Sequence, residues 1–250
     1  MLIRNGKAFT RGLLLMASFL VVFVLFFMPI FPAQEAGGEK TNGLVFADHL
    51  FNTLSKGSSN FFDPTLKSDM SVNVAVERLK DKTTDIEVPF KDASAIEPLQ
   101  TLLKEQGFEV SSSGSSVKMK GDLYPLFTTI LNDSLSTYNN NFDEVAQRHG
   151  GMEGRVVMKT WWTMLDAMIK PMQRAGQVNE AAVANTVKGK AVESSYNFYG
   201  ITPLRVVDNI PLVAGFLIFY VIYTMWYGFA IFELFEGIGL TMKKGAKSEV

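Results

Sequence analysis

Residues 12–31 read GLLLMASFLVVFVLFFMPIF, and residues 212–234 read LVAGFLIFYVIYTMWYGFAIFEL. At the helical rise of about 1.5 Å per residue, each stretch is long enough to cross a hydrocarbon core of about 30 Å. Between them lie roughly 180 residues of mixed composition. We therefore predict two transmembrane helices, over 12–31 and 209–236, that flank one folded domain.

Basic residues flank the two apolar stretches on their outer sides. They are Arg4, Lys7 and Arg11 before the first stretch, and Lys243, Lys244 and Lys247 after the second. Positive charge beside a span marks its cytoplasmic side. The pattern predicts cytoplasmic tails over 1–11 and 237–250, a domain in the periplasm, and a location in the bacterial inner membrane.

A cleaved signal peptide is the alternative for the N-terminal segment. This segment joins a basic start to an apolar core and to small residues at Ala33 and Ala36. Its apolar run of about 20 residues is longer than the 7–15 usual for a signal core. Phe31 and Pro32 also crowd a cleavage site after Ala33, so a retained anchor is favoured.

Composition excludes several classes of function. The chain contains no cysteine, which excludes thiolate metal sites, cysteine-ligated clusters and lipidation at a thiol. Segment 32–208 has a net charge of about −4 with both signs dispersed, so we expect no nucleic-acid binding. We find no phosphate-binding or hydrolase motif, and His49 and His149 have no second ligand at metal spacing. We predict no cofactor, no metal and no enzymatic activity, with both histidines on the surface or hydrogen-bonded.

The outer segment divides into a linker over 32–42, an α+β part over 43–140 and a helical part over 141–208. Alternating apolar residues predict strands over 70–76, 86–90, 108–112 and 116–120, the last two joined by a hairpin turn at Ser113-Gly114. Helical spacing predicts a helix before the first strand, one after the second and one after the fourth. The stretch around 70–76 also fits helical spacing, and we choose a strand because β-branched residues dominate it.

The order strand, strand, helix, strand, strand, helix is satisfied by one antiparallel sheet covered on one face by two helices. This order resembles an incomplete ferredoxin-like domain, and segment 86–121 resembles envelope domains that bind peptidoglycan. Each resemblance covers less than half of the chain and includes no motif, so it implies an α+β fold and no functional residue.

The second apolar stretch carries the most unusual polar residues. Glu233 and Glu236 share one helical face near its cytoplasmic end, and carboxylates within a span are costly and often functional. The simpler interpretation is that both acids lie at the membrane interface, because Lys243 and Lys244 follow closely. The alternative is contact with a partner subunit or part of a proton or cation path. Trp226 and the many other aromatic residues here predict protein on one side of the helix and lipid on the other.

Two aromatic groups are candidates in the outer segment. Trp161 and Trp162 point about 100° apart on a helix, so Trp161 should be buried and Trp162 should lie at the edge of the core. Trp162 is therefore either part of a wide core face or a contact for a partner, since aromatic residues concentrate in interface hot spots. Tyr196, Phe198 and Tyr199 are candidates for an aromatic belt at the membrane interface. Packing within the domain and ligand binding are the alternatives for these three.

These features predict a non-catalytic accessory or scaffold subunit of a membrane complex. Its partners would be other membrane subunits, the lipid bilayer or a second copy of the chain. The alternative is a module that binds the cell envelope or senses a periplasmic solute through a partner. An enzyme that uses scattered Asp, Glu and Tyr side chains is a third, weaker alternative.

Overall fold

The computed structural model describes residues 3–33, 38–63 and 71–240. The chain folds into two compact units. Residues up to Leu54 join those from Leu204 onward in one unit, which we call the anchor unit. Residues Ser55–Pro203 form the other, which we call the domain. The predicted segments 43–140 and 141–208 both contribute to one hydrophobic core within the domain.

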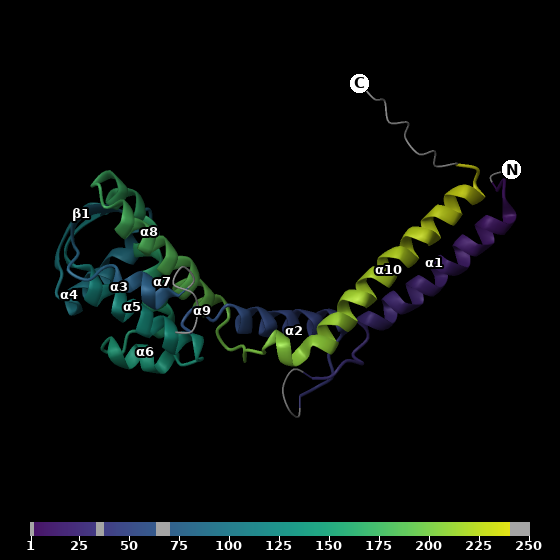
Figure 1. The fold of residues 1–250 in the computed structure, drawn as a ribbon, viewed down its shortest axis with the longest axis horizontal. Coiled ribbons are helices and arrows are strands. Elements are labelled where there is room, and N and C mark those ends of the chain that lie inside the picture. The colour runs from purple at the N-terminus through teal and green to yellow at the C-terminus, as the bar shows by residue number, and fades with distance from the viewer. Residues whose placement is uncertain (1–2, 34–37, 64–70, 241–250) are drawn as a thin grey trace, which may run out of the picture. The chain divides into compact units, whose positions relative to one another are not determined.

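The anchor unit contains two long helices side by side (Figure 1), α1 at Gly6–Phe27 and α10 at Ile210–Gly237. A third helix, α2 at Gly43–Ser58, begins in this unit, and the short 3-10 helix η3 at Val206–Asn209 precedes α10. Both α1 and α10 are long and apolar enough to span a membrane. Most of their large apolar side chains are exposed, which is typical of a helix in lipid rather than of a soluble core helix.

The first helix begins and ends earlier than the predicted 12–31. Asn5 caps its start, because its Oδ1 accepts a hydrogen bond from the Ala8 amide at 3.2 Å. Pro29 follows its end at Phe27, and a proline disfavours helical conformation in the residue before it. A polar cap and a proline, rather than the extent of apolar sequence, therefore place the helix boundaries.

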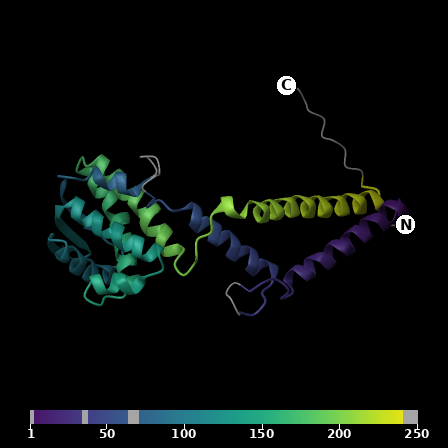
Figure 2. The ribbon, with the colours of Figure 1, turned by 60° about the horizontal axis from the view of Figure 1, so that its bottom comes forward.

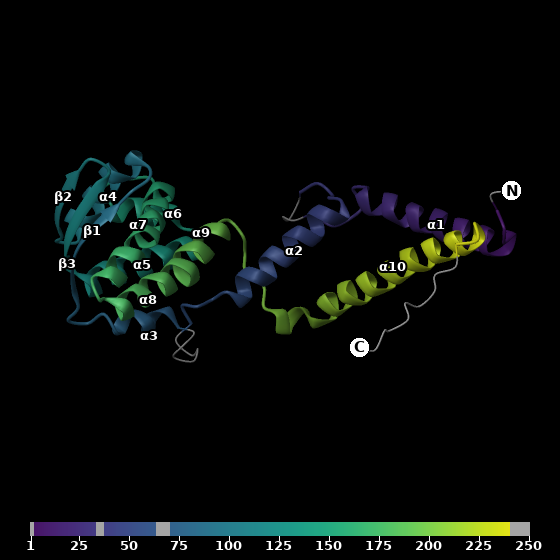
Figure 3. The same cartoon turned by 90° about the horizontal axis from the view of Figure 1, so that it is seen from above.

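The domain is a mixed α+β fold with a small antiparallel sheet, and Figure 3 shows helices on one side of the strands. Its elements in chain order are α3 at Val72–Glu77, β1 at Thr83–Pro89, η1 at Ala93–Ala95, α4 at Ile96–Glu105, β2 at Glu109–Ser113, β3 at Ser116–Asp122, α5 at Leu123–Tyr138, α6 at Phe142–Arg148, α7 at Gly154–Arg174, α8 at Val178–Val187, the π-helical segment η2 at Lys188–Glu193, and α9 at Ser194–Asn197. The central helix is α7, which packs against β1, α4, α6 and α8.

The sheet has the order β1-β3-β2 and follows the predicted alternation. Ile86 of β1 and Val110 of β2 both pair with Met119 of β3. Ile86 and Met119 are buried, while the alternate residues of both strands are exposed. The predicted hairpin joins β2 to β3 and has Gly114 at a φ of +59°, a conformation that glycine adopts without strain.

The predicted strand over 70–76 is wrong in the part that the structure describes, since Val72–Glu77 is helix α3. Val72 and Val76 are buried together with Leu79, whereas Val74, which would share their face in a strand, is 36% exposed. Helical spacing thus buries one continuous apolar face, and this outweighs the β-propensity of valine. Among the described residues the sheet has three strands rather than four.

Candidate interaction sites

In the anchor unit, the backbones of α1 and α10 approach each other closely near Gly12 and Gly237, where the two helices pack antiparallel. A Cβ at Gly12 would lie 2.6 Å from the backbone nitrogen of Leu234, and one at Gly237 would lie 2.6 Å from the Cα of Phe9. Small residues permit such backbone contact between membrane helices. The amides of Arg4 and Asn5 also donate to the Gly237 carbonyl at 2.9 and 3.0 Å. These bonds satisfy backbone groups that helix ends leave free.

Both acids predicted as candidates in α10 face α1 of the same chain. Glu233 Oε2 lies 3.4 Å from an Arg11 guanidinium nitrogen, and Glu236 Oε1 accepts a 3.5 Å hydrogen bond from the Asn5 amide group. The Glu233 side chain is 19% exposed and that of Arg11 is 65% exposed. In this ion pair the carboxylate is therefore largely buried, while its arginine partner is mostly exposed. Within the described chain, no hydrogen-bond donor with good geometry reaches the buried Oε2 atom.

Glu233 also lines a groove of about 480 Å³ with Trp226, the third candidate in this helix. We call it the Trp226 groove; its lining residues are Leu15, Ile222, Met225, Trp226, Phe229 and Glu233. The Trp226 indole N–H donates to the Leu15 carbonyl at 3.1 Å, which fixes the ring between the two helices. The groove is apolar except for the Glu233 carboxylate at one end.

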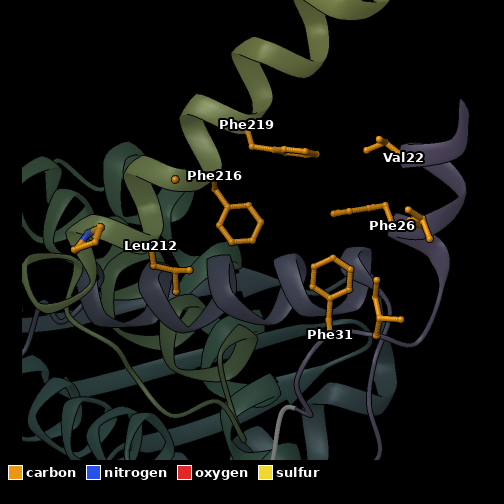
Figure 4. Close-up of a pocket in the computed structure, with 10 residues that line it drawn as sticks. Val22, Phe26, Phe31, Leu212, Phe216 and Phe219 are labelled. Atoms are coloured by element: carbon orange, nitrogen blue, oxygen red, sulfur yellow. The ribbon is translucent and has the colours of Figure 1, made fainter. Parts of the chain in front are cut away.

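A second opening lies toward the other end of the helix pair, where Figure 2 shows α1 and α10 diverging. We call it the phenylalanine cavity. Its volume is about 370 Å³, and its lining residues are Val22, Leu25, Phe26, Ile30, Phe31, Pro211, Leu212, Gly215, Phe216 and Phe219. Figure 4 shows Val22 and Phe26 facing Phe216 and Phe219 across it. Sequence reasoning missed this cavity, although the density of phenylalanine in both apolar stretches is its signal.

In the domain, the two neighbouring tryptophans separate as predicted. Trp161 is fully buried and Trp162 is 39% exposed. Trp162 lines a pocket of about 380 Å³, the Trp162 pocket, whose other lining residues are Met158, Lys159, Val192, Glu193, Tyr196 and Asn197. Two of the residues predicted as candidates, Trp162 and Tyr196, thus meet at one site.

The indole of Trp162 is held in place by its neighbours. Its N–H donates to Glu193 Oε1 at 2.7 Å, and Lys188 Nζ lies 5.9 Å from the ring centroid. Lys188 in turn pairs with Asp166 at 2.8 Å. Glu193 and Lys188 are the two ends of η2, and π-helical segments occur frequently at functional sites.

The remaining aromatic candidates pack within the domain. The Tyr199 ring lies 3.8 Å from that of Phe142, and the Tyr196 ring lies 6.4 Å from it, measured between centroids. Arg155 lies over the Phe142 and Tyr199 rings. Phe198 is half-buried. Whether these residues lie at a membrane interface stays a prediction, because the contacts within the domain are the same with or without a membrane nearby.

The most polar part of the core surrounds His149. Its Nδ1 lies 2.7 Å from a Glu105 oxygen, and its Nε2 lies 2.8 Å from Asp133 Oδ2. Asp133 is fully buried and also accepts bonds from Trp161 Nε1 at 2.8 Å and Arg148 Nε at 3.0 Å. Burial by itself lowers the pKa of His149, but hydrogen bonds and charge from Asp133 and Glu105 outweigh it and raise this pKa above its ordinary value. The predicted hydrogen-bonded histidine is confirmed at this position.

A second buried cation, Lys56, has no carboxylate partner among the described residues. Its Nζ donates to Asn140 Oδ1 at 2.8 Å and to the Ile201 carbonyl at 2.7 Å. Burial lowers the pKa of Lys56 to about 8. Lys56 and Ile201 lie near the first and last residues of the domain, so this hydrogen bond joins the two ends of the domain. No pattern near Lys56 in the sequence identifies it.

The described residues contain no group of three His, Cys, Asp or Glu side chains that could hold a metal ion. Three of the pockets among the described residues are lined by the apolar helices or by the predicted candidates: the Trp226 groove, the phenylalanine cavity and the Trp162 pocket. Compared with protein-family models, with curated proteins and with solved structures, the chain finds no match in any of the three.

Proposed function

We propose that this chain is a non-catalytic accessory subunit of a protein complex in the bacterial inner membrane. In this proposal α1 and α10 span the membrane, both termini are cytoplasmic, and the domain lies in the periplasm. The observation that carries the proposal is the Trp226 groove. It combines large apolar side chains with a Glu233 oxygen that pairs with Arg11 at 3.4 Å but accepts no hydrogen bond of good geometry from any described residue.

At about 480 Å³ the groove is too small to enclose a helix, but it would receive side chains of a partner's transmembrane helix, one of them a hydrogen-bond donor at the depth of Glu233. Met225 and Phe229 are 54% and 57% exposed, so they are available for such a contact. Aromatic side chains and Met are enriched at protein interfaces. A donor from the partner would complete the bonding of Glu233, and a carboxylate in lipid gains from each bond.

The test is photo-crosslinking from full-length protein in its native membrane. A photoreactive residue at Phe229 should join one membrane protein. The same residue at Tyr220, which is 64% exposed on α10 and lines neither the Trp226 groove nor the phenylalanine cavity, should not. The double substitution Met225→Ala with Phe229→Ala should weaken co-purification of that partner at least about tenfold, while Tyr220→Ala leaves it unchanged. If Phe229 and Tyr220 both crosslink to lipid alone, α1 and α10 serve only as a membrane anchor. If Phe229 crosslinks to a second copy of the chain, the complex is a homo-oligomer.

The Trp162 pocket supports a second candidate function, in which the domain binds an envelope fragment or a periplasmic solute. It joins an exposed indole to Lys159, Glu193 and Asn197, and ligand sites usually combine apolar walls with a few polar groups. Muropeptides added to the detergent-solubilised full chain should change its tryptophan fluorescence, and Trp162→Phe should abolish the change. Trp226→Phe is the control. An equal response in both variants would place binding elsewhere.

A further inference from the structure

The phenylalanine cavity has an unusual combination of place and chemistry. It lies between two helices that are each long and apolar enough to span a membrane. All of its lining side chains are hydrocarbon, apart from Gly215, which has none. Leu217 and Ile218 on the neighbouring surface of α10 are each 60% exposed. In the proposed membrane arrangement, hydrocarbon therefore surrounds the cavity as well as lining it.

The size and lining of the cavity exclude two occupants. Water needs two or more polar partners at a buried site, and no lining side chain offers one. Two turns of a transmembrane helix fill a cylinder of roughly 850 Å³, taken at a diameter of about 10 Å. The cavity holds about 370 Å³, so a partner helix does not fit. A single flexible hydrocarbon chain meets both the volume and the lack of polar groups.

We propose that the phenylalanine cavity binds one acyl chain of a membrane lipid. The inference rests on the proposed membrane span and adds to it a lipid site that is separate from the Trp226 groove. The cavity lies at the Phe27 and Ile210 ends of the two helices, away from the basic N-terminal residues. In the proposed topology this is the periplasmic leaflet, so the bound lipid belongs to that leaflet.

The aromatic walls are held in place by ring contacts, one between two wall residues and one to a ring outside the cavity. Phe26 stacks with Phe219 at 6.3 Å between centroids, and Phe46 of α2 stacks with Phe216 at 6.2 Å. Gly43, at the start of α2, lies directly against the Phe26 ring, where any Cβ would overlap it. Rigid rings with few rotatable bonds lose little entropy when a ligand enters.

Two glycines in α10 supply a matched pair of variants. A Cβ at Gly215 or at Gly228 would meet no atom within 4 Å, and neither glycine has a positive φ. Both substitutions to Phe are therefore tolerated by the backbone. Gly215 lines the cavity and Gly228 does not, so only Gly215→Phe adds volume there. Val22→Phe adds volume from the α1 wall and serves as a second filling variant.

The experiment uses full-length protein in nanodiscs of phosphatidylethanolamine that carries a diazirine in the middle of one acyl chain. After illumination, peptides that contain Phe216 and Phe219 should carry the lipid. Gly215→Phe and Val22→Phe should each reduce this labelling at least about tenfold relative to Gly228→Phe, which should match the unsubstituted chain. Native mass spectrometry of the same proteins should show one retained lipid that both filling variants lose.

Equal labelling in the filling variants and in Gly228→Phe would overturn the lipid site, as would labelling spread evenly along α10. A protein crosslinked within the cavity would overturn it as well. Partner crosslinking from Phe229 is measured in the same variants, and it should persist in Gly215→Phe. Loss of lipid with the partner retained supports two separate sites, whereas loss of both would show that the variant has disturbed the helix pair. Extraction of the chain by alkaline carbonate tests the membrane span independently of either site.

Discussion

At the residue scale, Asp133 is the clearest example of a buried charge made tolerable by its partners. It is fully buried, yet it accepts hydrogen bonds from His149, Trp161 and Arg148. Such a network contributes less net stability than its number of bonds suggests, because each ion loses water on burial. Removing one member is nevertheless costly, because the others then stay buried without a partner.

We expect Asp133→Asn to lower the free energy of unfolding by about 3–5 kcal/mol, because His149 and Arg148 lose the fully buried one of their two carboxylate partners. Glu144→Gln is the control, since Glu144 also pairs with Arg148 but its side chain is 50% exposed. That change should cost less than about 1 kcal/mol. Thermal unfolding of the full chain in mild detergent measures both. Equal losses of unfolding free energy in the two variants would mean that burial of the carboxylate does not determine how much its removal destabilises the domain.

The raised pKa of His149 predicts how stability depends on pH. The groups that face its ring are Glu105 from α4 and Asp133 from α5, with Arg148 of α6 bonded to the same aspartate. A group whose pKa is raised in the folded state stabilises that state fully below its unfolded pKa of about 6.5. This contribution is lost as the pH rises through the folded pKa. The unfolding temperature should therefore fall as the pH rises from about 6.5 through the folded pKa of His149. His149→Gln should remove this pH-dependent decrease.

At the element scale, local periodicity predicted most of the domain, and the exceptions have identifiable causes. Strands β1 and β3 alternate cleanly because one face is buried and the other carries charge, as in the Lys118–Asp85 pair at 3.5 Å. Helix α3 was predicted as a strand because the spacing of its valines fits both a helix and a strand. Only the core decided between the two, by covering Val72 and Val76 and leaving Val74 exposed.

The α1–α10 contact gives a prediction about helix packing. Gly12→Leu should separate the two helices, because even a Cβ at this position overlaps the backbone of α10. The amides of Arg4 and Asn5 would then lose their bonds to Gly237 and exchange hydrogen at least about tenfold faster, equivalent to about 1.4 kcal/mol. Gly228→Leu should leave exchange unchanged, because a Cβ added at this position meets no atom within 4 Å. Unchanged exchange in Gly12→Leu would show that the helices do not depend on this contact.

At the scale of the whole molecule, the domain is inserted between two apolar helices in the chain. Its first and last parts are joined by Lys56, Asn140 and Ile201. Adjacent chain ends are common in independently folded domains, and they allow such a domain to be carried between two anchors. The proposed orientation then follows from the basic residues beside the two spans.

This orientation is testable because the chain has no natural cysteine. Ser115→Cys places one thiol at the exposed β2–β3 turn and avoids the positive φ of Gly114. An impermeant maleimide should label it in intact spheroplasts. A cysteine at Gly6 should be labelled only after lysis, because it lies on the proposed cytoplasmic side. The opposite pattern would reverse the topology.

The sequence by itself determined the features that depend on neighbouring residues. These are the two apolar helices, the alternating strands and the β2–β3 turn, since each follows from a short repeat of side-chain character. Only the tertiary structure decided which distant residues meet. It placed Arg11 beside Glu233, set His149 between Glu105 and Asp133, and brought Trp162 and Tyr196 to one pocket. Such contacts depend on how helices pack in three dimensions, and no local pattern encodes which partner a given side chain will face.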